Sequence, residues 1–230
     1  MSKLSYRLRL LHAFAGAVPF TAFMLLDLWA NAKAAEGPAA FEHAMGWPRR
    51  VPLSALIALA LPILFHAIFG LWLAVRALSQ FPTSTSPSPR HVLQRVTGLI
   101  ALVYVGLRLK TFWLPLWTPG SVASDVRTEW VAWASTTWNG MPLAAYAWLL
   151  ALAAIAFHLG HGVVLAALRF GLAPTRRHRL VVTAVGALVG TLAFAFGAHG
   201  AIALATGWSP LALGSEPSGG ACAPQNGTAP

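Results

Sequence analysis

The sequence predicts an all-α membrane protein, a bundle of five transmembrane helices. Hydrophobic residues make up 57% of the 230 residues and charged residues only 10%, whereas a soluble domain carries about 25% charged residues. Five segments are apolar over roughly the 20 residues that a helix needs to cross the hydrocarbon core. None alternates with the period of two that a barrel strand shows. Backbone groups inside lipid must be hydrogen-bonded within the segment, so all five segments are predicted to be helices.

The first two helices are predicted at about residues 10–30 and 51–75. The first follows basic residues, as the apolar part of a signal peptide does. It is too long for such a peptide and contains Pro19 and Asp27, so we expect it to be a retained helix. The second has arginines on both sides, and these charges define its ends.

The other three helices are predicted at about residues 91–113, 141–168 and 180–206. The third is the least apolar of the five. Residues 81–89, between the second and third helices, are rich in Pro and Ser and are predicted to form a loop. A longer polar connection, 118–140, contains three tryptophans typical of a membrane interface and has room for a short surface helix.

The predicted transmembrane domain occupies residues 1–208, and the low-complexity segment 209–230 is predicted to be a disordered C-terminal tail. The tail contains Cys222, the one cysteine in the sequence. A single cysteine excludes an internal disulfide framework, a cysteine-based zinc site and a cysteine-bound iron–sulfur cluster. Any redox centre held by this chain would therefore use other ligands, and histidine is the obvious candidate.

Lysine and arginine are distributed unevenly between the two ends of the predicted bundle. One end carries ten of the sixteen: Lys3, Arg7, Arg9, Arg76, Arg90, Arg95, Arg169, Arg176, Arg177 and Arg179. The other end carries four: Lys33, Arg49, Arg50 and Arg127. Because cytoplasmic loops are enriched in Lys and Arg, the N-terminus is predicted to be cytoplasmic and the C-terminus external. The net charge of +10 then needs no nucleic-acid partner.

Two histidines lie deep inside predicted spans, where ionisable residues indicate function. His66 is ten residues before Arg76, and His158 is eleven residues before Arg169. Both histidines are thus about 15–17 Å from the basic ends of their helices. These helices run in the same direction, so the imidazoles can face each other at one level. This is the geometry of a b-type haem with two axial histidines.

Glycine follows each of these histidines at a spacing of four residues, as Gly70 and Gly162. Residues four apart share a helix face, so the glycines would leave room for a porphyrin edge. The alternative is that His66 and His158 only hydrogen-bond to neighbouring helices and that the glycines are ordinary packing residues. The matched depth and the paired glycines favour the haem.

Other residues are weaker candidates for contacts with a cofactor. His12 and Arg95 are candidates for a haem propionate or a quinone, with Ser54 as a further quinone candidate, and His161 is a candidate donor beside His158. The remaining histidines are interpreted as solvated, near headgroups or without an assigned partner: His43, His91, His178 and His199.

Four segments carry a family resemblance: RLRLLHAFAGAVPF (7–20), LPILFHAIFGLW (61–72), QRVTGLIALVYV (94–105) and AFHLGHG (156–162). They resemble the single-chain cytochrome b subunit of succinate dehydrogenases and fumarate reductases. The resemblance implies a multi-pass subunit of the bacterial cytoplasmic (inner) membrane. It would dock flavoprotein and iron–sulfur subunits on its cytoplasmic face and exchange electrons with quinone in the respiratory chain. The chain shows no flavin site, dinucleotide fingerprint or cluster ligand of its own, so it is expected to be a non-catalytic subunit.

The sequence departs from the family pattern at two positions. In that family the helices hold two stacked b haems; the first four helices each supply one histidine, and helices two and four hold the inner haem. Asp27 and Arg108 stand where the ligands of the outer haem, from helices one and three, are expected. Each lies eighteen residues after a basic helix start, Arg9 or Arg90, so their depths are similar. We expect an Asp27–Arg108 ion pair in place of the outer haem. The alternative is that Arg108 and Lys110 each snorkel to the membrane interface and that Asp27 is protonated.

The resemblance and its departure together imply one haem b on the inner side and a quinone site near the iron–sulfur subunit. Turnover would then be nearly independent of membrane potential. Two alternatives stay open: a haem subunit of another quinone-linked respiratory enzyme, and a haem-free structural membrane anchor. A transporter is disfavoured because no internal repeat is apparent in the sequence.

Overall fold

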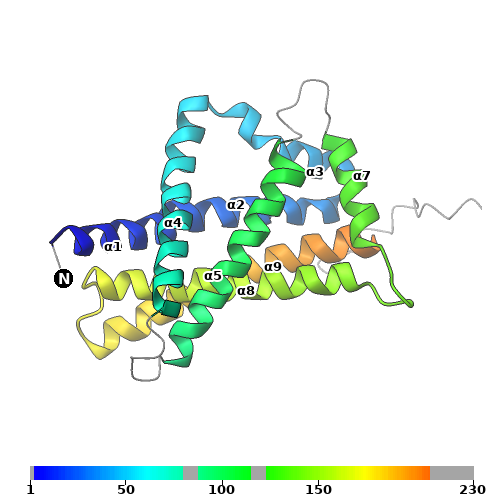
Figure 1. Ribbon diagram of the computed structural model, residues 1–230. Helices are drawn as coiled ribbons and strands as arrows, with labels where there is room; N and C mark the ends of the chain where they lie inside the picture. The colour runs from blue at the N-terminus through cyan, green and yellow to red at the C-terminus, as the bar shows by residue number, and fades with distance from the viewer. Residues whose placement is uncertain (1–2, 80–87, 115–122, 208–230) are drawn as a thin grey trace, which may run out of the picture.

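The computed structural model describes residues 3–79, 88–114 and 123–207, and these residues form helices and no β-strand (Figure 1). Five of the helices are long and apolar enough to cross a membrane. The predicted fold class, an all-α membrane protein with five spans, is therefore confirmed. The tail 209–230 and nearly all of the loop predicted at 81–89 lie outside the described residues.

The first span is a continuous helix with a change of pitch in its middle. It consists of α1 (Lys3–Ala15), a π-helical turn (Gly16–Phe20), α2 (Thr21–Ala32) and a 3₁₀ turn (Lys33–Glu36). Pro19 has no N–H to donate within the π-turn. The Thr21 hydroxyl donates to the carbonyl of Gly16 at 2.9 Å. Such π-turns frequently occur at functional sites.

The remaining spans are single long helices. They are α4 (Leu53–Ser79), α5 (Pro89–Arg108) with a π-helical extension (Leu109–Trp113), α8 (Leu143–Arg169) and α9 (Arg176–Thr206). Polar and basic residues continue the helices past several of the predicted ends, whereas α4 and α8 begin later than predicted, directly after Pro52 and Pro142. Their outer faces carry exposed leucine, isoleucine and valine side chains, as lipid-facing surfaces do.

Shorter helices lie between the spans. α3 (Pro38–Met45) and a 3₁₀ turn (Trp47–Arg50) join the first span to α4, and α7 (Ala123–Ala134) precedes α8. α3 has a proline in its first turn, where the missing N–H has no cost. α7 lies in the connection for which the sequence indicated a short surface helix, and it packs against α3, α8 and α9.

Small residues bring α8 and α9 into close contact. A Cβ atom on Gly186 would lie 2.5 Å from the carbonyl oxygen of Gly160, and one on Gly190 would lie 2.8 Å from that of Ala156. This is the small-residue packing that membrane helices use. The α8–α9 pair and the first span lie along one another, whereas α4 and α5 cross them steeply (Figure 1). The structure thus differs from the expectation that the second and fourth spans run in the same direction (Figure 1).

Candidate functional site

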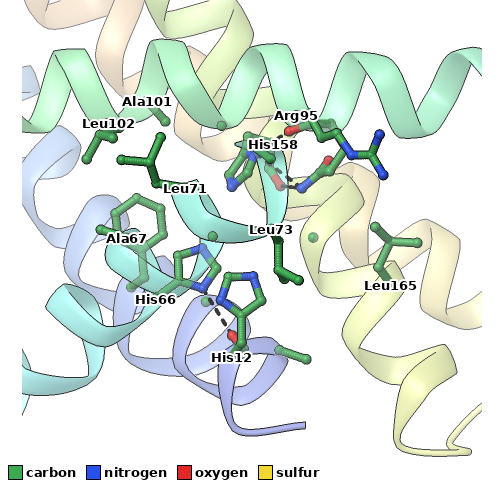
Figure 2. Close-up of a pocket in the computed structure, with 18 of the residues that line it drawn as sticks. His12, His66, Ala67, Leu71, Leu73, Arg95, Ala101, Leu102, His158 and Leu165 are labelled. Atoms are coloured by element: carbon green, nitrogen blue, oxygen red, sulfur yellow. Dashed lines mark hydrogen bonds between the residues drawn. The ribbon is translucent and has the colours of Figure 1, made fainter. Parts of the chain in front are cut away.

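A cavity of about 540 Å³ lies among the first span, α4, α5 and α8 (Figure 2). Its volume is in the range of about 300–1,000 Å³ that is usual for cofactor and ligand sites. Histidines, glycines and arginines from all four helices line it, and α9 contributes no lining residue. The polar residues and glycines that line it are His12, Gly16, His66, Gly70, His91, Gln94, Gly98, His158 and Gly162, together with Arg9, Arg76, Arg95 and Arg169.

His66 is oriented by the backbone of the first span. Its Nδ1 atom lies 3.0 Å from the carbonyl oxygen of His12, and its ring stacks on the His12 ring with centroids 4.2 Å apart (Figure 2). A carbonyl oxygen can only accept, so this hydrogen bond places the ring proton on Nδ1. The Nε2 atom of neutral His66 then keeps its lone pair and is available as a metal ligand.

His158 is oriented in the same way by α5. Its Nδ1 atom lies 3.1 Å from the carbonyl oxygen of Gln94 and 3.2 Å from the Gln94 amide nitrogen. When Nδ1 carries the proton and donates it to that carbonyl, Nε2 carries the free lone pair. Metal-binding histidines almost always donate their second ring N–H to a carbonyl or a carboxylate, which fixes ring orientation and tautomer. His66 and His158 both show this arrangement.

The separation of the two rings suits an iron held between them. The ring centroids of His66 and His158 are 6.3 Å apart and the ring planes are inclined by 73°. Two metal–imidazole bonds of about 2 Å each, with the half-width of each ring added, would place the ring centres about 6 Å apart. The distance between the two ring centres therefore matches that of two imidazoles bound to one iron.

Glycines give the imidazoles access to the carbonyl groups. Gly16 follows His12, and Gly98 follows Gln94, each by four residues. A helical Cβ atom leans toward the preceding turn, so a side chain at this spacing would cover the carbonyl four residues earlier. A Cβ atom on Gly16 would lie 2.6 Å from Nδ1 of His66, and one on Gly98 would lie 2.7 Å from Cε1 of His158.

The two glycines singled out in the sequence lie in the same cavity but against different neighbours. A Cβ atom on Gly70 would lie 3.1 Å from Cε1 of His12, and one on Gly162 would lie 3.5 Å from the amide nitrogen of Gln94. Each of the four glycines thus adjoins a polar side chain from the facing helix. Sequence reasoning missed Gln94 and Gly98, although their spacing of four residues matches that of the histidines.

The cavity also carries positive charge. Four arginines line it: Arg9, Arg76, Arg95 and Arg169. Guanidinium groups bind carboxylates and other anionic oxygens well. The buried Nδ1 atom of His12 has no hydrogen-bond partner among the described residues, so it is available to a bound molecule. Ser54 does not line the cavity; it is exposed near the start of α4, at the opposite end of that helix from Arg76.

Asp27 and Arg108 lie together outside this cavity. Nη2 of Arg108 donates to the two carboxylate oxygens of Asp27 at 3.0 and 3.3 Å. The side chains are only 4% exposed for Arg108 and 2% for Asp27. The amide of Asn31 donates to the same carboxylate at 3.3 Å, and the guanidinium lies over the Trp130 ring. The first span and α5 are therefore joined by a buried charge pair.

One characterised protein shares part of this sequence. Over 101 residues the chain is 33% identical to the succinate dehydrogenase cytochrome b558 subunit of Bacillus subtilis strain 168. The match covers 42% of this chain, and the chain spans about half the length of that relative. No protein-family model and no solved structure matches the chain. The resemblance indicated by the sequence motifs is confirmed over this stretch.

Proposed function

We propose that the chain is the membrane anchor and b-haem subunit of a succinate:quinone oxidoreductase, passing electrons between an iron–sulfur subunit and quinone. The observation that carries this proposal is the pair formed by His66 and His158. The two rings are 6.3 Å apart, and each has Nδ1 directed at a backbone carbonyl. The matched relative is itself named a cytochrome b subunit of succinate dehydrogenase, which supports the assignment of the enzyme.

In this proposal His66 and His158 are the axial ligands, and a b-type haem bound there would supply a one-electron carrier. The carbonyl groups of His12 and Gln94 hold the two rings in the tautomer that leaves Nε2 unprotonated. Gly16 and Gly98 keep those carbonyls accessible. The backbone thus performs the orienting task that a carboxylate performs in many metal sites.

The positive residues around the cavity are proposed to bind the anionic and polar parts of the ligands. Arg95 and His12 are the proposed contacts for a haem propionate or for the quinone. Both line the cavity. We propose that the basic end of the bundle faces the bacterial cytoplasm, where flavoprotein and iron–sulfur subunits would dock.

A single haem per chain is proposed because Asp27 and Arg108 stand where the family has ligands for a second one. Their contact at 3.0 Å and their burial support this proposal. Reduced-minus-oxidised spectra and haem counting on the purified complex are expected to show one b-type haem per chain. His66→Ala and His158→Ala are each expected to remove it, because one imidazole cannot supply both axial positions.

The same preparation tests the alternatives. A count of two haems would refute the single-haem proposal. No b-type spectrum in the wild-type complex would leave only a haem-free anchor. Co-purifying subunits other than a flavoprotein and an iron–sulfur protein would indicate a different quinone-linked enzyme.

Succinate:quinone turnover is expected to be nearly independent of membrane potential. Moving one charge across the membrane costs about 2.3 kcal/mol per 100 mV, and this cost is avoided when the electron donor and the quinone site are on the same side. The measurement is the rate in proteoliposomes with and without an imposed potassium diffusion potential. A rate that falls several-fold as the potential is raised would contradict the cytoplasmic quinone site.

A further inference from the structure

The Gln94 side chain connects α5 to α8 directly beside the proposed haem ligand. Its amide nitrogen donates to the backbone carbonyl of His158 at 3.1 Å. Its amide oxygen lies 2.9 Å from Nδ1 of His161. Because a carbonyl can only accept, the amide nitrogen must be the atom that faces His158, and the oxygen then accepts from His161. Both ends of the amide are thus fixed.

A glycine also leaves the backbone carbonyl of His158 accessible to the Gln94 side chain. Gly162 follows His158 by four residues, so no side chain covers the carbonyl to which Gln94 donates. The backbone carbonyl of Gln94 in turn faces Nδ1 of His158. Gln94 and His158 therefore exchange hydrogen bonds in both directions, through side chain and backbone. His12 is the residue that faces His66 in the other half of the cavity.

The hydrogen bonds at Nδ1 determine which nitrogen of His158 is available to a metal. Nδ1 lies 3.1 Å from the Gln94 carbonyl and 3.2 Å from the Gln94 amide nitrogen. Donation to the carbonyl leaves Nε2 free, whereas acceptance from the amide would put the proton on Nε2. The amide nitrogen has two N–H groups, so one can donate to the His158 carbonyl while the other faces Nδ1. An iron on Nε2 requires the proton on Nδ1, and the Gln94 carbonyl is then the acceptor for that proton.

We propose that Gln94, held by His161, is a positioning residue whose side chain fixes the ring plane of His158 for axial ligation. This inference rests on the proposed function, because it concerns the orientation of one proposed haem ligand. No substitution at residue 94 removes the backbone carbonyl, so the haem should still bind without the Gln94 side chain. What should be lost is the fixed angle between the two imidazole planes.

The test is electron paramagnetic resonance of the ferric complex together with the rate of haem transfer to an acceptor apoprotein. The g-values of low-spin ferric haem depend on the angle between the axial imidazole planes, and the largest g-value is highest when the planes are nearly perpendicular. In Gln94→Leu, release from the 73° inclination is expected to lower the largest g-value and to broaden the signal. Haem transfer is expected to become about tenfold faster, as for other losses of an orienting partner.

His161→Phe keeps a ring beside Phe157 but removes the donor to the Gln94 oxygen. It is therefore also expected to lower the largest g-value and to make haem transfer faster. The double variant should show the same g-values and haem-transfer rate as Gln94→Leu alone, since both changes remove the hydrogen bond between Gln94 and His161. Val96→Ala is the matched control, because Val96 is half-exposed on the same helix and should leave both measurements unchanged.

The outcomes separate this inference from the function on which it rests. A wild-type complex without haem would overturn both. A haem-containing wild type whose Gln94 and His161 variants keep its g-values and transfer rate would overturn the positioning role alone. If Gln94→Leu does not accumulate in the membrane, His161→Phe decides the question.

Discussion

Gly98→Ala and Gly16→Ala are each expected to abolish haem binding while the helices stay folded. Alanine is the better helix former by about 1 kcal/mol, so the helices themselves gain from the change. The new methyl group on residue 98 would lie 2.7 Å from Cε1 of His158, and the one on residue 16 would lie 2.6 Å from Nδ1 of His66. Each imidazole would have to leave its carbonyl. The measurement is haem per chain in purified protein, with helix content as the folding check.

Gly106→Ala is the matched control for Gly98→Ala. It lies on the same helix, and nothing would be within 4 Å of the added Cβ atom. Its haem content should equal that of the wild type. Gly70→Ala and Gly162→Ala should have smaller effects, because their added atoms would lie 3.1 and 3.5 Å from side chains that can shift. A normal haem content in both Gly16→Ala and Gly98→Ala would contradict this account of the site.

The sequence predicted that His66 and His158 face each other, and their rings are 6.3 Å apart in the structure. This pair was found from two similar distances to helix-terminal arginines. Its counterpart, the pair of carbonyl acceptors, could not be found in this way, because every residue has a carbonyl group. The only local signal for an accessible carbonyl is a glycine four residues later, and Gln94–Gly98 shows this signal without a histidine to draw attention to it.

The arrangement of the helices was less predictable than their number. Apolar length identifies each span, because it reflects the thickness of the hydrocarbon core. The crossing of α4 over the first span depends on which faces pack, and contacts such as those of His66 with His12 and Gly16 decide this. Ser54 was misplaced for a simpler reason: it is near the end of α4 opposite to the arginine that marked the inner side.

Arg108→Leu alone is expected to destabilise the protein by about 3–5 kcal/mol, because it leaves the Asp27 carboxylate buried without its cation. Asn31 would remain as a hydrogen-bond donor to that carboxylate, but an amide does not neutralise a charge. The double variant Asp27→Leu/Arg108→Leu should recover most of this loss, since an apolar pair of similar volume is often as stable as a buried ion pair. The measurement is the free energy of unfolding of the wild type and of the two variants in one detergent.

The double variant also separates the stability of this pair from the chemistry of the cavity. Neither Asp27 nor Arg108 lines the cavity between His66 and His158, so haem content should match the wild type once stability is restored. A double variant as unstable as Arg108→Leu would mean that the guanidinium contributes chiefly through its position over Trp130, 5.1 Å from the ring centre. A stable double variant that has lost its haem would mean that the charge pair supports the cavity from a distance. If instead haem and stability return together, the buried pair only joins the first span to α5, in the place where the family has its second pair of ligands.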